Sequence, residues 1–184
     1  MLAVGRVCTS LRALLAAIFT LALTAVAQAQ PIMHRDAAPA GEASPTGGSF
    51  SIQFPVAFRD METKIPDPER GTISVRLLSG AGSDNIRFSA MEVPRLKGDK
   101  PLESFVEEVG KRPGASISDV KRERVGDLET LSFTYRDPRE MSFFQISRNQ
   151  QNGYTLVMQF PETQLAKATG MKDKFFRSFK TTTP

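Results

Sequence analysis

The sequence of 184 residues contains one cysteine, one histidine and no tryptophan. A disulfide framework, a zinc site built from Cys and His, and a Cys–His nucleophilic pair therefore lack the residues from which they are built. Basic residues exceed acidic residues only slightly, 24 against 20, whereas proteins that bind nucleic acid concentrate a larger surplus. We expect no cofactor and no nucleic-acid partner.

Apolar side chains are abundant enough for a packed core. The hydrophobic fraction is 40%, and 13 residues are phenylalanine. This composition argues against wholesale disorder, a collagen-like repeat and a coiled coil. The length is typical of one domain.

Residues 1–29 have the pattern of a secretory signal peptide. Arg6 and Arg12 precede an uncharged apolar stretch over residues 13–29, which ends in small residues suited to cleavage. Cleavage would lower the formal net charge from +4 to +2, so part of the basic surplus belongs to targeting. We predict export to the periplasm or the extracellular space. Because the stretch reaches the lower length limit of a membrane span, a retained anchor stays as an alternative, as does peripheral association with a membrane.

Residues 30–48 are rich in Pro, Ala, Gly and Ser, and Ile32 and Met33 are their only sizeable apolar side chains. Such a segment buries too little area to offset its ordering entropy, so a flexible linker is predicted. A general base needs fixed geometry; we therefore do not expect His34, which lies in this linker, to be catalytic. A single domain over residues 49–184 follows.

Alternation of apolar and polar residues predicts strands through most of this domain. Turn-forming Gly, Pro, Asn and Asp separate the strands, and several neighbouring pairs are typical of hairpins. The predicted strands cover 49–54, 57–65, 72–79, 85–93, 117–124, 128–135, 141–148 and 154–160.

Two segments change to a helical period. Apolar residues from Leu102 to Val109 lie at i, i+3, i+4 and i+7, which predicts a helix with Asp99 as its N-cap. A second helix is predicted after a Thr163 cap, ending near residue 177, and a short strand over 179–182. The sequence therefore predicts an α+β fold, an antiparallel β-sheet flanked by two α-helices.

Acidic residues show no spacing typical of a catalytic pair. Glu107 and Glu108 are consecutive on the first predicted helix, so their side chains diverge by about 100°, and we interpret them as a solvated flank. Four other acids are candidates for a hard cation, although their spacing is not that of a calcium loop: Asp60, Glu62, Asp67 and Glu69.

Nucleophile and phosphate motifs are weak. Neither a G-x-S-x-G nor an S-x-x-K motif occurs, and the nearest serine with a base is Ser178 with Lys180, at a predicted helix-to-strand junction, which we interpret as structural. Gly80 and Gly82 join two predicted strands instead of opening a helix, so they do not predict a phosphate loop.

The densest basic region lies in the second half of the chain. If the two predicted hairpins are neighbours, its side chains could share a face and bind an anionic partner. The alternative is an ordinary solvated sheet face, because acids are interleaved at similar density. The basic residues are Lys121, Arg122, Arg124, Arg136, Arg139 and Arg148, and the acids are Glu123, Asp127, Asp137 and Glu140.

Several segments resemble the PsbP-like and DcrB-like exported domains. Gly48–Pro55 is similar to their first strand, which ends in Phe-Pro, and 125–129 fits a hairpin in the middle. Residues 154–161 and 175–180 are similar to the last strand and the aromatic end of the final helix. The resemblance implies a PsbP-like α/β/α sandwich and an accessory or assembly role in exported and membrane complexes. It implies no catalytic residue.

Three functional hypotheses follow. The first is a non-enzymatic exported accessory or binding module for a protein or envelope component. The second is a carrier or sensor of a small apolar or anionic ligand in a sheet–helix cleft, with Arg122, Arg124 or Arg136 orienting the anion. The third is a hydrolase that uses carboxylates or Ser178.

Overall fold

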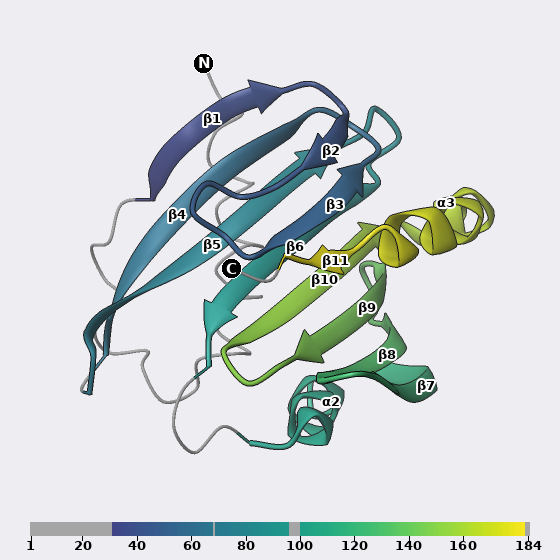
Figure 1. Ribbon diagram of the computed structural model, residues 1–184. Helices are drawn as coiled ribbons and strands as arrows, with labels where there is room; N and C mark the ends of the chain where they lie inside the picture. Colours follow the sequence, from purple (N-terminus) through teal and green to yellow (C-terminus); the bar gives the residue numbers. More distant parts are fainter. Residues whose placement is uncertain (1–30, 68, 96–99, 183–184) are drawn as a thin grey trace.

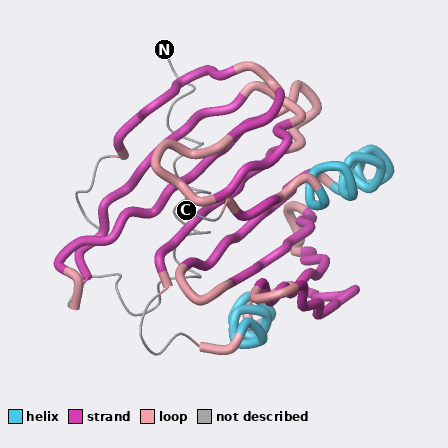
Figure 2. The backbone as a smooth tube through the Cα atoms, in the orientation of Figure 1, coloured by secondary structure: helices cyan, strands magenta, loops and turns pink. Residues whose placement is uncertain are grey.

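The computed structural model describes residues 31–67, 69–95 and 100–182, and these form an α+β fold dominated by antiparallel strands (Figures 1 and 2). The predicted α+β class is therefore confirmed. The predicted signal peptide lies outside the described residues. The first strand of the structure begins at Ile32.

The larger of two sheets holds eight strands, each antiparallel to its neighbours (Figure 1). Pairing of β6 with β10 joins the four strands of the first half of the chain to the four of the second. The seven predicted strands between residues 57 and 160 are confirmed. In spatial order the eight strands of the sheet are β1 (Ile32–Ala38), β4 (Phe58–Asp67), β5 (Gly71–Ala81), β6 (Arg87–Pro94), β10 (Asn152–Phe160), β9 (Met141–Arg148), β8 (Leu128–Arg136) and β7 (Ser116–Val125).

A second, three-stranded sheet has the order β11 (Lys180–Thr181), β3 (Phe50–Phe54), β2 (Gly41–Ala43). The predicted first strand and the short strand near the C-terminus are both confirmed. They pair with each other, which local sequence could not indicate because more than a hundred residues separate them.

Two helices pack against the large sheet. The predicted first helix is confirmed as α2 (Leu102–Gly110), with Pro101 as its N-cap; the predicted cap Asp99 lies outside the described residues. The second is α3 (Leu165–Arg177), preceded by a 3-10 turn, η2 (Glu162–Gln164). The prediction that Thr163 caps this helix is wrong. The Gln164 N–H donates to the Pro161 carbonyl and closes the 3-10 turn, so Gln164 is the N-cap of α3.

The small sheet and α3 pack on one face of the large sheet, which we call the α3 face. Phe54 of β3 lies 5.2 Å from Phe58 of β4 and 5.8 Å from Phe175 of α3, between ring centroids. Phe88 of β6 lies 5.2 Å from Phe175. Aromatic side chains from both sheets and α3 therefore share one core, in which edge-to-face contacts are favoured.

Helix α2 packs on the opposite face, which we call the α2 face. Phe133 of β8 and Phe144 of β9 stack at 4.9 Å, and Phe105 of α2 lies 6.0 Å from Phe144. A separate cluster of buried Ile65, Ile73, Val75 and Met91 lies farther along the same face, on β4, β5 and β6.

The structure differs from the predicted flexible linker, because residues 32–43 contribute β1 and β2. Buried Asp60 accepts hydrogen bonds from Arg35 of β1 at 2.8 and 3.1 Å, and from the Thr46 backbone and hydroxyl at 3.1 and 2.7 Å. The small apolar area that the segment can bury does not indicate this order. Charge-assisted hydrogen bonds to the buried Asp60 carboxylate hold the segment in place.

A second buried carboxylate holds the end of this segment. Glu92 accepts the Ser49 backbone N–H at 2.7 Å and pairs with Arg76 at 3.4 Å. The backbone of Gly48 packs so closely against Pro45 that a Cβ on Gly48 would lie 2.4 Å from Pro45 Cγ. Polar anchoring and a required glycine thus fix a segment whose composition is typical of linkers.

Candidate functional site

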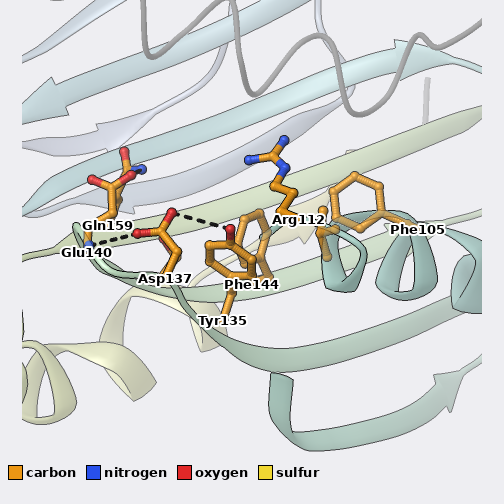
Figure 3. A pocket seen from close by; sticks show the side chains of 9 residues that line it. Phe105, Arg112, Tyr135, Asp137, Glu140, Phe144 and Gln159 are labelled. Carbon is orange, nitrogen blue, oxygen red and sulfur yellow. Dashed lines mark hydrogen bonds between the residues drawn. The ribbon is translucent and has the colours of Figure 1, made fainter. Parts of the chain in front are cut away.

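A small cavity lies between α2 and the α2 face of the large sheet (Figure 3). Its volume is about 30 Å³, enough for one or two water molecules and far below the ~300–1,000 Å³ of typical small-molecule sites. Phe105, Val109 and Phe144 form its apolar wall. Sequence reasoning placed the first two in a helix core and did not identify the cavity.

The polar wall is organised by the turn between β8 and β9. Asp137 Oδ1 accepts the backbone N–H group of Arg139 at 2.7 Å. It also accepts that of Glu140 at 3.0 Å, and Asp137 Oδ2 accepts the Tyr135 hydroxyl at 3.3 Å (Figure 3). This is the Asx-turn geometry that an Asp-Pro sequence favours. The Asp137–Glu140 segment could therefore have been predicted as a turn, although its position beside α2 could not.

Burial raises the pKa of the Glu140 carboxyl, and the attraction of Arg87 opposes this rise. The carboxylate contacts both Arg87 and Gln159. Burial also raises the pKa of Tyr135; Asp137 adds to that rise, and Arg112 opposes it through its charge and a hydrogen bond. Arg112 lines the cavity together with the carboxyl groups of Asp137 and Glu140, and the guanidinium of Arg87 contacts Glu140.

The two carboxyl groups of the cavity are already engaged by donors of the protein. Glu140 is held by Arg87 and Gln159, and Asp137 by two backbone N–H groups and Tyr135. A general base must reach the proton that it abstracts, whereas these acceptors are occupied by protein donors. The arrangement is that of a structural hydrogen-bond network.

The structure does not bring the six predicted basic residues together. By strand register, Arg122, Arg124 and Arg148 lie on the α2 face; we call these three the arginine cluster. Lys121 and Arg136 lie on the α3 face, and Arg139 is in the β8–β9 turn. The predicted hairpins are neighbours, since β8 pairs with β9. Successive side chains of a strand point to opposite faces, so Lys121 and Arg122 of β7 are separated. The odd and even numbers of these two residues could have indicated this.

Two glutamates lie within the arginine cluster. Arg122 pairs with Glu103 of α2 at 2.6 Å and also with Glu129 of β8, which Arg148 contacts at 2.7 Å. Hydrogen bonds from Arg122 and Arg148 lower the pKa of Glu129, and the bond to Glu129 raises the pKa of Arg122. Arg124 is exposed and has no ion-pair partner in the described part of the chain. The cluster therefore keeps a surplus of positive charge.

The arginine cluster borders an edge of the large sheet. Strand β7 is the last in the strand order, so its outer side pairs with no described strand. Its side chains are exposed apart from Ile117, and Val120 and Val125 are 52% and 75% exposed. Sequence reasoning identified β7 as a strand but not as an edge, because strand order depends on long-range pairing.

The remaining candidates have structural roles. Ser178 Oγ accepts the Gln53 backbone N–H at 3.0 Å and donates to the Phe175 carbonyl at 2.6 Å, which joins α3 to β3. His34 Nε2 lies 3.1 Å from Glu62, so the histidine is held on β1 and not loose as expected.

The four acids proposed for a cation are also separated in role. Asp60 is buried against Arg35, and hydrogen bonds from Ser74 and His34 lower the pKa of Glu62. Asp67 accepts the backbone N–H groups of Glu69 and Arg70 in a turn. Within the described ranges, no group of three or more His, Cys, Asp or Glu side chains could hold a metal ion.

Comparison with known proteins leaves the family open. No protein-family model matches the sequence, and no curated protein matches it. Among the described residues, neither α2 nor α3 has the length and apolar character needed to cross a membrane.

Proposed function

We propose that this chain is a non-enzymatic exported binding module whose partner is an exported or envelope protein. One observation carries the proposal: the open edge of β7 lies beside the arginine cluster. Exposed backbone hydrogen-bonding groups, two exposed valines and a surplus guanidinium at Arg124 occur on this one edge. Unpaired strand edges and exposed apolar side chains are features of protein interaction sites.

The cavity favours binding over catalysis. Both of its carboxyl groups are engaged by arginine, amide or backbone donors, and Ser178, the proposed nucleophile, bonds to backbone groups of two other elements. A hydrolase needs a nucleophile within hydrogen-bond reach of a base. Neither of the two Ser178 contacts is with a carboxylate, histidine or lysine, so they give the hydrolase hypothesis no such pair.

The small-ligand hypothesis receives less support than the binding-module hypothesis. A cleft between the sheet and a helix is present, as that hypothesis expects, but its volume is about 30 Å³. Arg122, Arg124 and Arg136 were expected to orient an anion, and none of them lines it; Arg112 does. The cavity has room for one or two water molecules only, whereas Arg122 and Arg124 lie on the surface beside the open edge of β7.

We also propose that the fold is a PsbP-like α/β/α sandwich. The packing of α2 and α3 on opposite faces of one antiparallel sheet supports it. The Phe-Pro end of β3 and the aromatic end of α3 are further support. Export is proposed on the pattern of residues 1–29.

Affinity capture with a charge-reversed edge tests the proposed function. The mature chain is used as bait on envelope extract, together with the variants Arg124→Glu and, as a matched control, Arg177→Glu, an exposed arginine on α3. We expect a specific protein to be retained by the wild type and the control and lost with Arg124→Glu. Equal capture by all three baits would contradict the proposal.

A further inference from the structure

We infer that the partner supplies an acidic extended segment, which adds to the large sheet as a ninth strand beside β7. This inference rests on the proposed function and specifies the chemistry of its partner. Addition of a strand to a sheet edge gains affinity from main-chain hydrogen bonds and specificity from alternate side chains.

The register singles out β7 over the other edge of the sheet. Strand β1 pairs with β4 through two register shifts, between Met33 and Arg35 and between Arg35 and Ala38. In β7 a single shift lies between Ser118 and Lys121, and the pairing with β8 is continuous from Lys121 to Val125. A regular edge of five residues can pair with a partner strand, whereas the bulged edge of β1 offers shorter regular runs.

Charge decides which strand fits this edge. Arg122 and Arg124 project from β7 on the α2 face, two residues apart. An added strand places alternate side chains directly beside them, where opposite charges stabilise pairing and like charges destabilise it. Glu103 and Glu129 pair with Arg122, and Arg124 has no ion-pair partner among the described residues. An acidic side chain beside Arg124 therefore complements the edge, because Arg122 is already paired within the protein.

The other face of the edge is less selective. Lys121, Glu123 and Val125 project on the α3 face, so their charges are balanced and Val125 is available for apolar contact. The bulge next to Ser118, with Asp119 at φ 55°, interrupts the edge before Lys121. Bulges and charged side chains discourage indiscriminate edge pairing. Here the bulge limits the added strand to about five residues, and Arg124 disfavours a strand with a basic side chain beside it.

Binding of synthetic peptides tests this inference. A fluorescent peptide TEVEVET presents glutamate on one face and valine on the other; TKVKVKT reverses the charge, and a backbone N-methylated TEVEVET blocks strand pairing. We expect TEVEVET to bind and TKVKVKT to bind about tenfold more weakly or not at all. N-methylation should abolish binding. Arg124→Glu should weaken TEVEVET binding about tenfold, and Arg177→Glu should leave it unchanged.

Amide hydrogen exchange locates the added strand. Alternate amides within Lys121–Val125 should gain protection on addition of TEVEVET, and those of β1 should not. Absence of TEVEVET binding, equal binding of the N-methylated peptide, or protection confined to β1 would each overturn the inference. If capture of a partner still depends on Arg124 in any of those cases, the proposed function stands and only strand addition is refuted.

Discussion

Two buried carboxylates determine how the N-terminal part of the fold is ordered. Asp60 receives donors from Arg35 and Thr46, and Glu92 receives the Ser49 backbone N–H. Both lie on the α3 face of the large sheet, beneath a segment whose composition predicts disorder. Each therefore substitutes for apolar area that this segment does not have.

Removal of the Asp60 charge tests that role. Asp60→Asn retains the shape of the side chain but loses the charge-assisted bonds to Arg35 and Thr46, so we expect the free energy of unfolding to fall by about 1–3 kcal/mol. Urea unfolding measures the change. Asp36→Asn, which alters an exposed pair with Arg59, should change it by less than about 0.5 kcal/mol. Equal effects would refute the anchoring role of Asp60.

Glu140 and Glu129 should affect the pH dependence of stability with opposite signs. Burial raises the pKa of Glu140 above its ordinary 4.5, so the folded state binds its proton more tightly, and stability from this group falls as pH rises from 4.5 through the raised pKa. The pKa of Glu129 is lowered by Arg122 and Arg148. Its contribution is present above 4.5 and is lost as pH falls through the lowered pKa.

Denaturant unfolding of Glu140→Gln and Glu129→Gln against the wild type, over a series of pH values, separates these effects. The wild type should lose stability relative to Glu140→Gln as pH rises above 4.5. It should lose stability relative to Glu129→Gln as pH falls below 4.5. The same slope for both variants would contradict the environments described for these groups.

Some helices and strands follow from the local sequence pattern, whereas others depend on contacts between residues far apart in the chain. Alternation in Tyr154–Phe160 and the helical stripe of Leu102–Val109 depend on neighbours in sequence, so these elements could be predicted. The strands β1 and β2 depend on Asp60, which lies more than 15 residues farther along the chain, and no local signal indicates this. For the candidate site, parity could separate Lys121 from Arg122, but the contact of Arg122 with Glu103 required the packing of α2.

Two glycine substitutions distinguish an element that requires glycine from one that tolerates it. A Cβ at Gly48 would lie 2.4 Å from Pro45, so Gly48→Ala should lower the free energy of unfolding by about 1–3 kcal/mol. Gly170 lies within α3 with no atom near its missing Cβ, and Gly170→Ala should raise it by about 0.5–1 kcal/mol. Thermal and urea unfolding measure both. Destabilisation by Gly170→Ala, or neutrality of Gly48→Ala, would contradict the packing described.

At the scale of the molecule, the two halves of the large sheet meet at β6 and β10 and leave β1 and β7 as its edges. The two edges differ in regularity and charge. β1 is irregular and carries Arg35, which is committed to buried Asp60; β7 is regular beyond its bulge and carries Arg124, which has no described ion-pair partner. Binding through β7 requires no rearrangement of either core.

Site-specific photocrosslinking in intact cells tests whether a partner binds at the β7 edge. A photoreactive residue replaces Val120 on β7 or, as the matched control, Met33 on β1, which is 43% exposed. We expect one discrete crosslinked protein species from position 120, its loss when Arg124→Glu is added, and no such species from position 33. Crosslinking from position 33 but not 120, or crosslinking from 120 that does not change with Arg124→Glu, would contradict binding at this edge.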